Sequence, residues 1–527
     1  KIYKVPGYFA ADGNAAQTSA QRGNKWRVHF SPDKIGRWHY AVSFRLRGKG
    51  VSFDGTKGSF VVRRSTAKGS RDHRRKGRLR YVGKHHLQFE ETREYFLKQG
   101  TDSPENFLAY ADFDGTPNNS DLRKTWSAHV RDWRRGDPTW KGNKGKGIIG
   151  AINYLSSKGM NAISFLTMNI QGDDKNVFPY INDNDFTRFD CSKLDQWEIV
   201  FSHFDKMGIY LHFKMTEWEN WMILDGDSFF GENRKLYYRE IIARFSHHLA
   251  LNWNIGEENG NTSQQQKAFA SFLHRIDPYN HPIVVHNRPN LADEIYTPLL
   301  GPRSLIAGTS MQISVNGFTS EVFSSVKKWV DKSAKSRKKW VVAVDEHGGP
   351  VAGIKPDKDS DNSHHTNARQ NALWGPIMAG GAGCEYFFGM LYDDSDLTCQ
   401  NFRSRDRWFD YCRHAIQFFE TNKIPFWEMS SQNGLVSNKK TWCLSDRTHY
   451  VIYLPGGETT NLDLRKMRKN FVRVEWYDPR NGGKLQNSSV KSIKGRRKMF
   501  DLGPPPRNIH QDWVVYVKGV GVLKRKS

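Results

Sequence analysis

The chain of 527 residues is too long for one ordinary domain, and its 80 lysines and arginines against 55 acidic residues give a formal net charge of +25. This charge favours a polyanionic partner, while 17 tryptophans and 13% aromatic residues suit a protein that stacks on sugar rings or packs several β-sheets. No apolar run reaches the roughly 18 residues that a membrane span needs. We therefore expect about three domains, no membrane span, and an acidic substrate or partner.

The first 85 residues predict an N-terminal β-sandwich domain (1–85). Lys25–Phe30, Trp38–Phe44 and Gly58–Val62 are short strand-like runs separated by Gly, Asn and Asp turns, a pattern typical of an immunoglobulin-like sandwich. Arg63–Arg80 then contains nine basic residues and a single acid, Asp72. This stretch fits equally a polyanion-binding patch and a solvated linker between domains.

From Glu94 to about Gly389, apolar strand-like runs alternate with amphipathic helical runs, which predicts parallel βα units. Lys193–Met207, for example, has apolar residues at helical spacing and is followed by Gly208 as a C-cap. The eight strand candidates are Glu94–Leu97, Ala162–Thr167, Ile209–Phe213, Leu249–Ile255, Ile283–His286, Leu305–Thr309, Trp340–Val344 and Gly383–Phe388. Eight such strands predict a central (β/α)8 TIM barrel over residues 86–428.

After Trp427 the helical pattern stops. His449–Leu454, Phe471–Tyr477 and Trp513–Val517 are strand-like and lie between Gly-rich and Pro-rich turns. They predict a second β-sandwich over residues 429–527. The expected architecture is thus multidomain, with the barrel flanked by N-terminal and C-terminal β-sandwich domains.

The cysteines and histidines show no pattern that indicates a metal or other cofactor. Cys191, Cys384, Cys399, Cys412 and Cys443 form no CxxC pair, so we expect buried free thiols, with one disulfide among the middle three left open. The adjacent pairs His247-His248 and His364-His365 lack chelating i, i+4 spacing. The chain begins at Lys1 rather than Met, which fits a mature secreted or periplasmic protein and equally a trimmed chain. Its oligomeric state is left open.

Two carboxylates come directly after strand-like runs. Glu258 follows Trp253–Glu257, and Glu346 follows Val341–Asp345. Side chains at the carboxyl ends of barrel strands collect at the mouth of the barrel, where active sites of this fold lie. Cleaving a glycosidic bond needs one protonated acid and one charged carboxylate. Either glutamate alone would as often be a solvated loop acid, but together they predict a glycosidase.

With these two strands in fourth and seventh place, the chain resembles the clan A retaining glycoside hydrolases. Those enzymes carry an Asn-Glu acid/base at strand four and a nucleophilic Glu at strand seven. The resemblance implies that Glu258 is the acid/base and Glu346 the nucleophile. Glu257 stands where those enzymes have the Asn that holds the sugar's 2-hydroxyl, which leaves the binding of that hydroxyl open and makes Glu257 a lesser candidate for the acid/base.

A closer resemblance covers nearly the whole chain. Tyr8–Gly13, Lys25–Phe30, Ser103–Leu108 and Glu475–Arg480 are similar to segments of bacterial glycoside hydrolases with a sandwich module before the barrel and a domain named as collagen-binding behind it. Some marine relatives act on algal galactans, including carrageenans. The resemblance implies an anionic, sulfated galactan of the carrageenan type as substrate and exo action on it, and Arg and Lys pair with sulfate much as with phosphate.

Three alternatives remain from sequence. One is a carbohydrate-binding or matrix-binding protein on a non-catalytic barrel, and another is a hydrolase of a neutral β-glycoside. A nucleic-acid binder is favoured by charge alone and shows no recognised motif, so we expect no nucleic-acid partner.

Other polar or aromatic residues follow the predicted strands and are candidate sugar contacts. Trp218 offers a flat ring for stacking on a pyranose, and Glu217 is a third carboxylate that can tune Glu258 or bind a hydroxyl. Each alone is more often a capping or core residue. The full set is Asn106, Asn169, Glu217, Trp218, His286, Asn287, Gln312 and His347.

Overall fold

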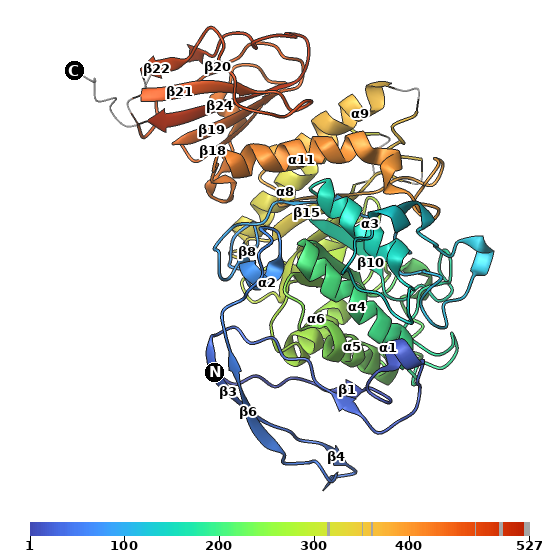
Figure 1. Ribbon diagram of the computed structural model, residues 1–527. Coiled ribbons are helices and arrows are strands. Elements are labelled where there is room, and N and C mark those ends of the chain that lie inside the picture. Colours follow the sequence, from blue (N-terminus) through green and yellow to red (C-terminus); the bar gives the residue numbers. More distant parts are fainter. Residues whose placement is uncertain (314–316, 350, 360–361, 470, 495–498, 521–527) are drawn as a thin grey trace.

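The computed structural model describes residues 1–313, 317–349, 351–359, 362–469, 471–494 and 499–520 (Figure 1). Its centre is a closed barrel of eight parallel strands, as predicted. In barrel order the strands are β9 (Lys98–Thr101), β10 (Ala162–Leu166), β11 (Tyr210–Lys214), β12 (Leu251–Asn254), β13 (Ile283–His286), β14 (Ile306–Ile313), β15 (Val341–His347) and β16 (Gly383–Tyr386). The expected first strand, Glu94–Leu97, lies just before β9, because β9 itself is polar and lacks a strand-like pattern.

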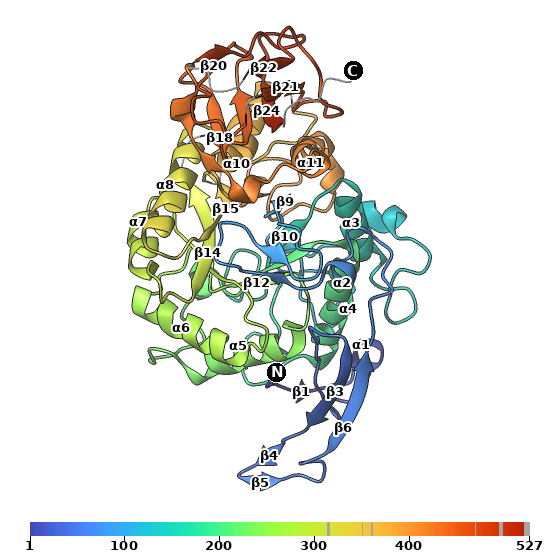
Figure 2. The same cartoon turned by 90° about the vertical axis from the view of Figure 1, so that its left-hand side faces the viewer.

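Helices surround the barrel (Figure 2). The longer ones are α3 (Lys146–Ser157), α4 (Cys191–Met207), α5 (Glu232–Phe245), α6 (Ser263–Ile276), α7 (Ala292–Tyr296), α8 (Glu321–Lys335), α9 (Asn362–Ala368) and α11 (Asp406–Thr421); α1 (Ala15–Thr18), α2 (His73–Lys76) and α10 (Gly375–Met378) are single turns, and a π-helical turn spans Arg369–Trp374. The α4 prediction is confirmed in detail. The Asp190 carboxylate accepts from Lys193 N at 3.0 Å, and Gly208 ends the helix with φ 73°.

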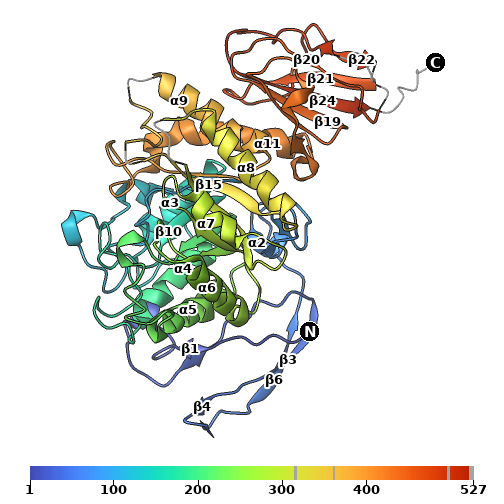
Figure 3. The same ribbon diagram turned by 180° about the vertical axis from the view of Figure 1, so that it is seen from behind.

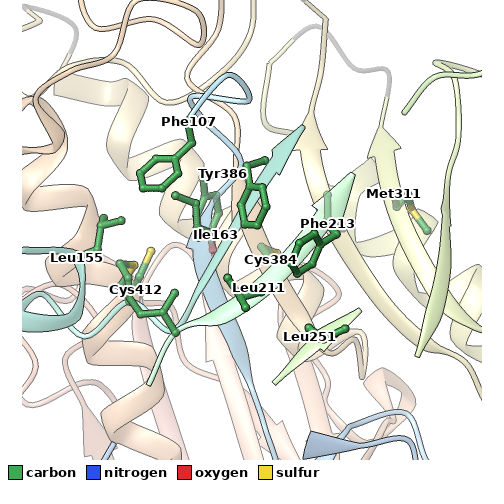
Figure 4. Close-up of a cluster of buried hydrophobic side chains, with 14 of the residues drawn as sticks. Phe107, Leu155, Ile163, Leu211, Phe213, Leu251, Met311, Cys384, Tyr386 and Cys412 are labelled. Carbon is green, nitrogen blue, oxygen red and sulfur yellow. The ribbon is translucent and has the colours of Figure 1, made fainter. Parts of the chain in front are cut away.

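Apolar side chains on the outer faces of the strands pack against these helices (Figure 4). Ile163, Leu211 and Phe213 lie there with Cys384 and Cys412. All five cysteines are buried and free, as expected. The thiols therefore act as small apolar core groups.

The barrel interior, in contrast, is charged. Lys98 Nζ lies 2.5 Å from Asp345 Oδ1 and 2.9 Å from Glu385 Oε2, and His212 Nδ1 lies 2.7 Å from the same Glu385 oxygen. Barrels of this fold usually fill this space with branched apolar side chains. Burying a charge is tolerated only when it is paired, so the interior forms one interlocked ion network below the mouth.

The N-terminal region is not the predicted sandwich. Its described residues form three two-stranded antiparallel pairs: β1 (Tyr8–Phe9) with β2 (Trp26–Arg27), β3 (Gly36–Ala41) with β6 (Lys57–Val62), and β4 (Arg45–Leu46) with β5 (Lys49–Gly50). The β3–β6 hairpin extends away from the barrel (Figure 2) and leaves Tyr40 48% and Val61 52% exposed. No second sheet among the described residues covers these side chains, so the alternating pattern does not build a two-layer core.

The second half of the basic stretch Arg63–Arg80 is built into the base of the barrel. It contains α2, capped by Asp72, and β7 (Leu79–Arg80), which pairs with β8 (Gln88–Phe89). Arg78 is buried, donates to the carbonyls of His248 and Ser31 at 3.1 Å, and stacks on Tyr279. This half is therefore neither a free patch nor a solvated linker.

The predicted C-terminal β domain is confirmed as a six-stranded antiparallel sheet with a two-stranded pair over one face (Figure 3). The sheet order is β17 (Ser430–Ser431), β18 (Trp442–Ser445), β19 (His449–Leu454), β24 (Trp513–Val520), β21 (Phe471–Tyr477) and β22 (Ser492–Lys494), and β20 (Asn461–Leu462) pairs with β23 (Phe500–Asp501). Alternate residues along the strands of this sheet pack into two different hydrophobic cores. Tyr453 and Val514 join the core of the barrel, whereas Ile452 and Val515 pack with Leu462.

A buried ion pair fixes the sheet to the barrel side. Arg369 donates to both carboxylate oxygens of Asp512, at 2.9 and 2.7 Å, and Tyr453 donates to the same carboxylate. Within the described part of the chain, no helix is long and apolar enough to cross a membrane.

Candidate active site

The chain leaving β12 makes a strained turn that presents two glutamates. Glu257 N donates to Thr216 O at 2.7 Å, which carries the strand pairing past the end of β11. Gly256 has φ 137°, and a Cβ there would come within 2.8 Å of Thr216 Oγ1. Glu258 then adopts φ 42°, a left-handed conformation that is uncommon for a non-glycine residue. Such strain is often concentrated at functional sites.

The nearby strand β15 contains a bulge. Met311 pairs with Val344 and Gln312 pairs with Glu346, so Asp345 is an extra residue in β15. Side chains alternate along a regular strand, and one extra residue lets both Asp345 and Glu346 face inward. Asp345 bonds Lys98 inside the barrel, while Glu346 lies at the mouth.

The mouth holds a cluster of three carboxyl groups, those of Glu257, Glu258 and Glu346. One ligand atom each of Glu257, Glu346 and His286 lie within 4.8 Å of one another. Burial raises the pKa of Glu346 well above its ordinary value, and the charges of Glu258 and Glu257 raise it further. Burial also raises the pKa of Glu257, against the opposing effect of Lys214. Ionisation of one carboxyl group in this cluster therefore opposes ionisation of the others.

Lys214, at the end of β11, is the cation that balances this cluster. Its ammonium bonds the Glu257 carboxylate and lies 2.8 Å from Asp102 Oδ1. Burial opposes the charge of this lysine, but Asp102 and Glu257 outweigh it and raise its pKa. The second carboxylate oxygen of Glu257 is buried and has no hydrogen-bond partner among the described residues.

His286 lies beside Glu346. Its Nε2 lies 3.7 Å from Glu346 Oε2, and its Nδ1 lies 3.2 Å from the Ser310 hydroxyl. Burial lowers the pKa of His286 well below its ordinary value, so the ring is neutral. If the Ser310 hydroxyl donates to Nδ1, the ring proton is on Nε2 and faces Glu346 at a distance longer than a hydrogen bond.

Three further candidate residues lie on the Glu258 side of the mouth. The Gln312 side chain hydrogen-bonds Glu258; burial raises the pKa of Glu258, and both this bond and Arg288 lower it. Trp218, in the turn Trp218–Asn220, is 38% exposed, and the Arg288 guanidinium lies 3.9 Å from its ring centroid. Glu217 is buried beside this turn, accepts from Asn220 Nδ2 at 3.2 Å, and has a pKa raised by burial.

Four predicted sugar contacts have other roles. Asn106 and Asn169 are fully buried and both donate to the Asp174 carboxylate, so they hold the loop after β10. Asn287 donates to Gln312 O at 2.8 Å and accepts from Tyr296 and the Gln312 amide. His347 follows the bulge, points away from the mouth, and stacks on Tyr386 at 5.5 Å. These contacts occupy the amide groups of Asn169 and Asn287, whereas Asn106 Oδ1 has no hydrogen-bond partner among the described residues and the His347 contact uses its ring face.

Sequence reasoning missed Lys214, Asp102 and Arg288. In β11, polar His212 and Lys214 alternate with apolar residues, and this pattern indicates that polar side chains of the strand point into the barrel. Arg288 follows His286 and Asn287, which were singled out, and only the fold shows that it reaches Trp218.

Two groups of ionisable residues in the barrel have spacing suited to a metal ion. They are Glu257, His286 and Glu346 at the mouth, and His212, Asp345 and Glu385 below it. An ammonium group already bonds each group, Lys214 the first and Lys98 the second. A second cation would be repelled at both places.

Two segments of the sequence match protein-family models. Residues 430–518 match the "putative collagen-binding domain of a collagenase", and residues 1–45 match a domain of unknown function, DUF5060. Together they cover well under half of the chain. No curated protein matches the sequence.

Several solved structures are similar over most of the chain. One, described as a "putative glycoside hydrolase" from Bacteroides vulgatus, is 14% identical, with a TM-score of 0.67 over 99% of this chain and 93% of that chain. A family 5 glycoside hydrolase from the same species is 15% identical, with a TM-score of 0.59 over 84% of this chain and 93% of that chain. At these identities the likeness shows the fold alone, and the chemistry has to be argued from the residues at the mouth.

Proposed function

We propose that this protein is a retaining glycoside hydrolase with Glu258 as the acid/base and Glu346 as the nucleophile. The observation that carries the proposal is the convergence of these two carboxyls, from the ends of strands four and seven, in one buried cluster where the charge of each opposes ionisation of the other. The similar structures named above as glycoside hydrolases support it.

In the proposed mechanism, protonated Glu258 gives its proton to the leaving oxygen while Glu346 attacks the anomeric carbon. The glycosidic bond breaks as a Glu346–glycosyl ester forms. Glu258, now a carboxylate, takes a proton from water, and the water oxygen displaces Glu346 from the sugar. His286 supports the charged form of Glu346 before attack and after release.

For the substrate, we propose an anionic polysaccharide, specifically a sulfated galactan of the carrageenan type cleaved from one end. Arg288 supports the anionic part, since it lies over Trp218 beside Glu258 and makes no ion pair within the described part of the chain. A sugar can pack against the exposed part of the Trp218 ring while its sulfate pairs with the guanidinium. The charge of +25 adds long-range attraction. Such a substrate lies outside the cell, so we propose secretion or export to the periplasm.

The deciding experiment is a panel of agarose, porphyran and κ-, ι- and λ-carrageenans, with a neutral β-glucan and β-mannan as controls. Reducing ends and product masses report turnover, and Glu346→Gln protein gives the background. Turnover of a sulfated galactan alone supports the whole proposal. Turnover of the neutral glycans alone supports the proposed reaction and contradicts the proposed sulfated substrate. Binding without turnover of any glycan indicates a carbohydrate-binding protein on an inactive barrel.

A further inference from the structure

A third ionisable cluster lies outside the barrel, where the N-terminal region meets the helices. His29 follows β2, Glu198 lies in α4, and His247 lies in the loop that enters β12. One ligand atom from each lies within 4.8 Å of the others. Because His247 precedes the start of β12 and the carboxyl cluster follows its end, the two sites are at opposite ends of that strand.

The spacing within this cluster suits a tetrahedral ion. Ligands 2.0 to 2.1 Å from a tetrahedral zinc ion lie about 3.3 Å from each other. His247 Nε2 and Glu198 Oε1 are 3.2 Å apart. One nitrogen of His29 lies within 4.8 Å of a ligand atom of each of the other two residues, and the His29 ring stacks on His247 with centroids 4.3 Å apart. All three side chains are partly exposed, so solvent can reach an ion held between them.

Neighbouring side chains already orient these three residues. His248 bridges the second oxygen of Glu198, at 3.1 Å, and Asp205, at 2.9 Å. Tyr8 OH lies 2.7 Å from His29 Nε2, which leaves Nδ1 of that ring for an ion. Outer partners of this kind fix the ring and carboxylate orientations in known metal sites.

This cluster also differs from the two barrel clusters in the cations that surround it. Glu198 contacts Ser202, His247 and His248, and no lysine or arginine pairs with it in the described residues. By contrast, Lys98 and Lys214 pair with the carboxylates of the two barrel clusters.

We propose that His29, Glu198 and His247 bind a divalent transition-metal ion of the zinc class. Two imidazoles and one carboxylate form a ligand set that binds zinc in preference to magnesium or calcium. The ion would join three segments that are distant in sequence, and so fasten the N-terminal region to the barrel. It would have no part in the reaction at the mouth.

The test uses the full chain after removal of metals by a chelator. Zinc binding is measured by calorimetry, and cobalt is added as a spectroscopic probe, since tetrahedral cobalt absorbs strongly in the visible range. We expect about one equivalent of each, with magnesium giving no heat. His29→Ala and His247→Ala should abolish the cobalt bands, and His39→Ala, at an exposed histidine of the same region, should leave them unchanged.

Protection of the N-terminal region is a second measurement that needs no variant. Zinc should slow proteolysis between the N-terminal pairs and the barrel several-fold in the unmodified chain and raise its melting temperature. The proposal is overturned if the unmodified chain gives no tetrahedral cobalt spectrum, or if the His29→Ala/His247→Ala double variant, folded by circular dichroism, binds zinc as tightly as the unmodified chain.

Discussion

The ammonium group of Lys214 bonds the carboxylate of Glu257, the residue immediately before the proposed acid/base. Both side chains are buried, and Asp102 completes the group at 2.8 Å. Two carboxylates therefore share one lysine directly below the mouth. Whatever changes this lysine changes the charge that the whole carboxyl cluster experiences.

Lys214→Met should destabilise the protein by about 3 to 5 kcal/mol, because it leaves two buried carboxylates without their cation. Denaturant unfolding at neutral pH measures this. Lys175→Met, at an exposed lysine, is the matched control and should change stability by less than about 0.5 kcal/mol. If both variants unfold at the same denaturant concentration, the ion triad contributes little.

Glu257→Gln should shift the acidic limb of the pH dependence of kcat/KM to lower pH, by roughly one unit. The sign follows from charge: Glu257 raises the pKa of Glu346, and a neutral glutamine removes this repulsion while Lys214 continues to favour the charged nucleophile. The enzyme should stay active on its natural substrate. An inactive variant that azide rescues on aryl glycosides would instead identify Glu257 as the acid/base.

Glu346→Gln should be nearly inactive on every substrate, because it removes the group that forms the covalent intermediate. Glu258→Gln should lose activity on natural glycans yet retain it on aryl glycosides with good leaving groups, which need no proton. Steady-state rates on both substrate types measure the difference. Equal losses for the two variants on the two substrate types would contradict the assigned roles.

A crystal structure with a bound inhibitor should place the carboxyl groups of Glu258 and Glu346 about 5 to 5.5 Å apart, the spacing of retaining enzymes. At that distance the nucleophile reaches the anomeric carbon directly. A separation near 9 Å would leave room for a water and indicate inversion. Product analysis by NMR gives an independent check of the stereochemical outcome.

Arg288→Gln should raise KM for a sulfated substrate about tenfold or more and leave KM for its desulfated form nearly unchanged, since only the sulfate pairs with the guanidinium. Binding of the sulfated form by the unmodified enzyme should also weaken with salt, which screens such pairs over about 8 to 10 Å. If Arg288→Gln weakens both forms equally, the side chain supports Trp218 and does not recognise sulfate.

The barrel was predictable because most of its strands are apolar and its helices have regular spacing. β9 was misplaced because its lysine is an inward-facing partner of two distant carboxylates and its glutamine accepts from the Tyr386 hydroxyl, and no local pattern reveals such partners. The N-terminal sandwich was wrong for a related reason. Alternation along Trp38–Phe44 and Gly58–Val62 indicates strands, but it does not say whether a second sheet exists to cover them.

The positions of the candidate site residues along the chain were predictable, whereas the orientations of their side chains were less so. Glu258 and Glu346 were found because strand ends are visible in sequence, whereas the bulge at Asp345 depends on register with β14. That bulge explains why Glu346 faces the mouth and His347 does not. Likewise, Asn287 was predicted to contact a sugar, but its amide group bonds Tyr296 and the backbone of Gln312, which are distant from it in sequence.

The two-sided packing of the C-terminal sheet bears on how such a module can be exchanged in evolution or in the laboratory. Residues 430–518 match a single family model, so this segment could be taken for a domain that folds independently. Yet Tyr453 and Val514 would become an exposed apolar surface on excision, and Asp512 would lose Arg369. A fusion of this segment alone to another protein should therefore aggregate. A fusion that also includes α11 and the Arg369–Trp374 turn should not. Any ligand surface on the module is confined to its edges and loops.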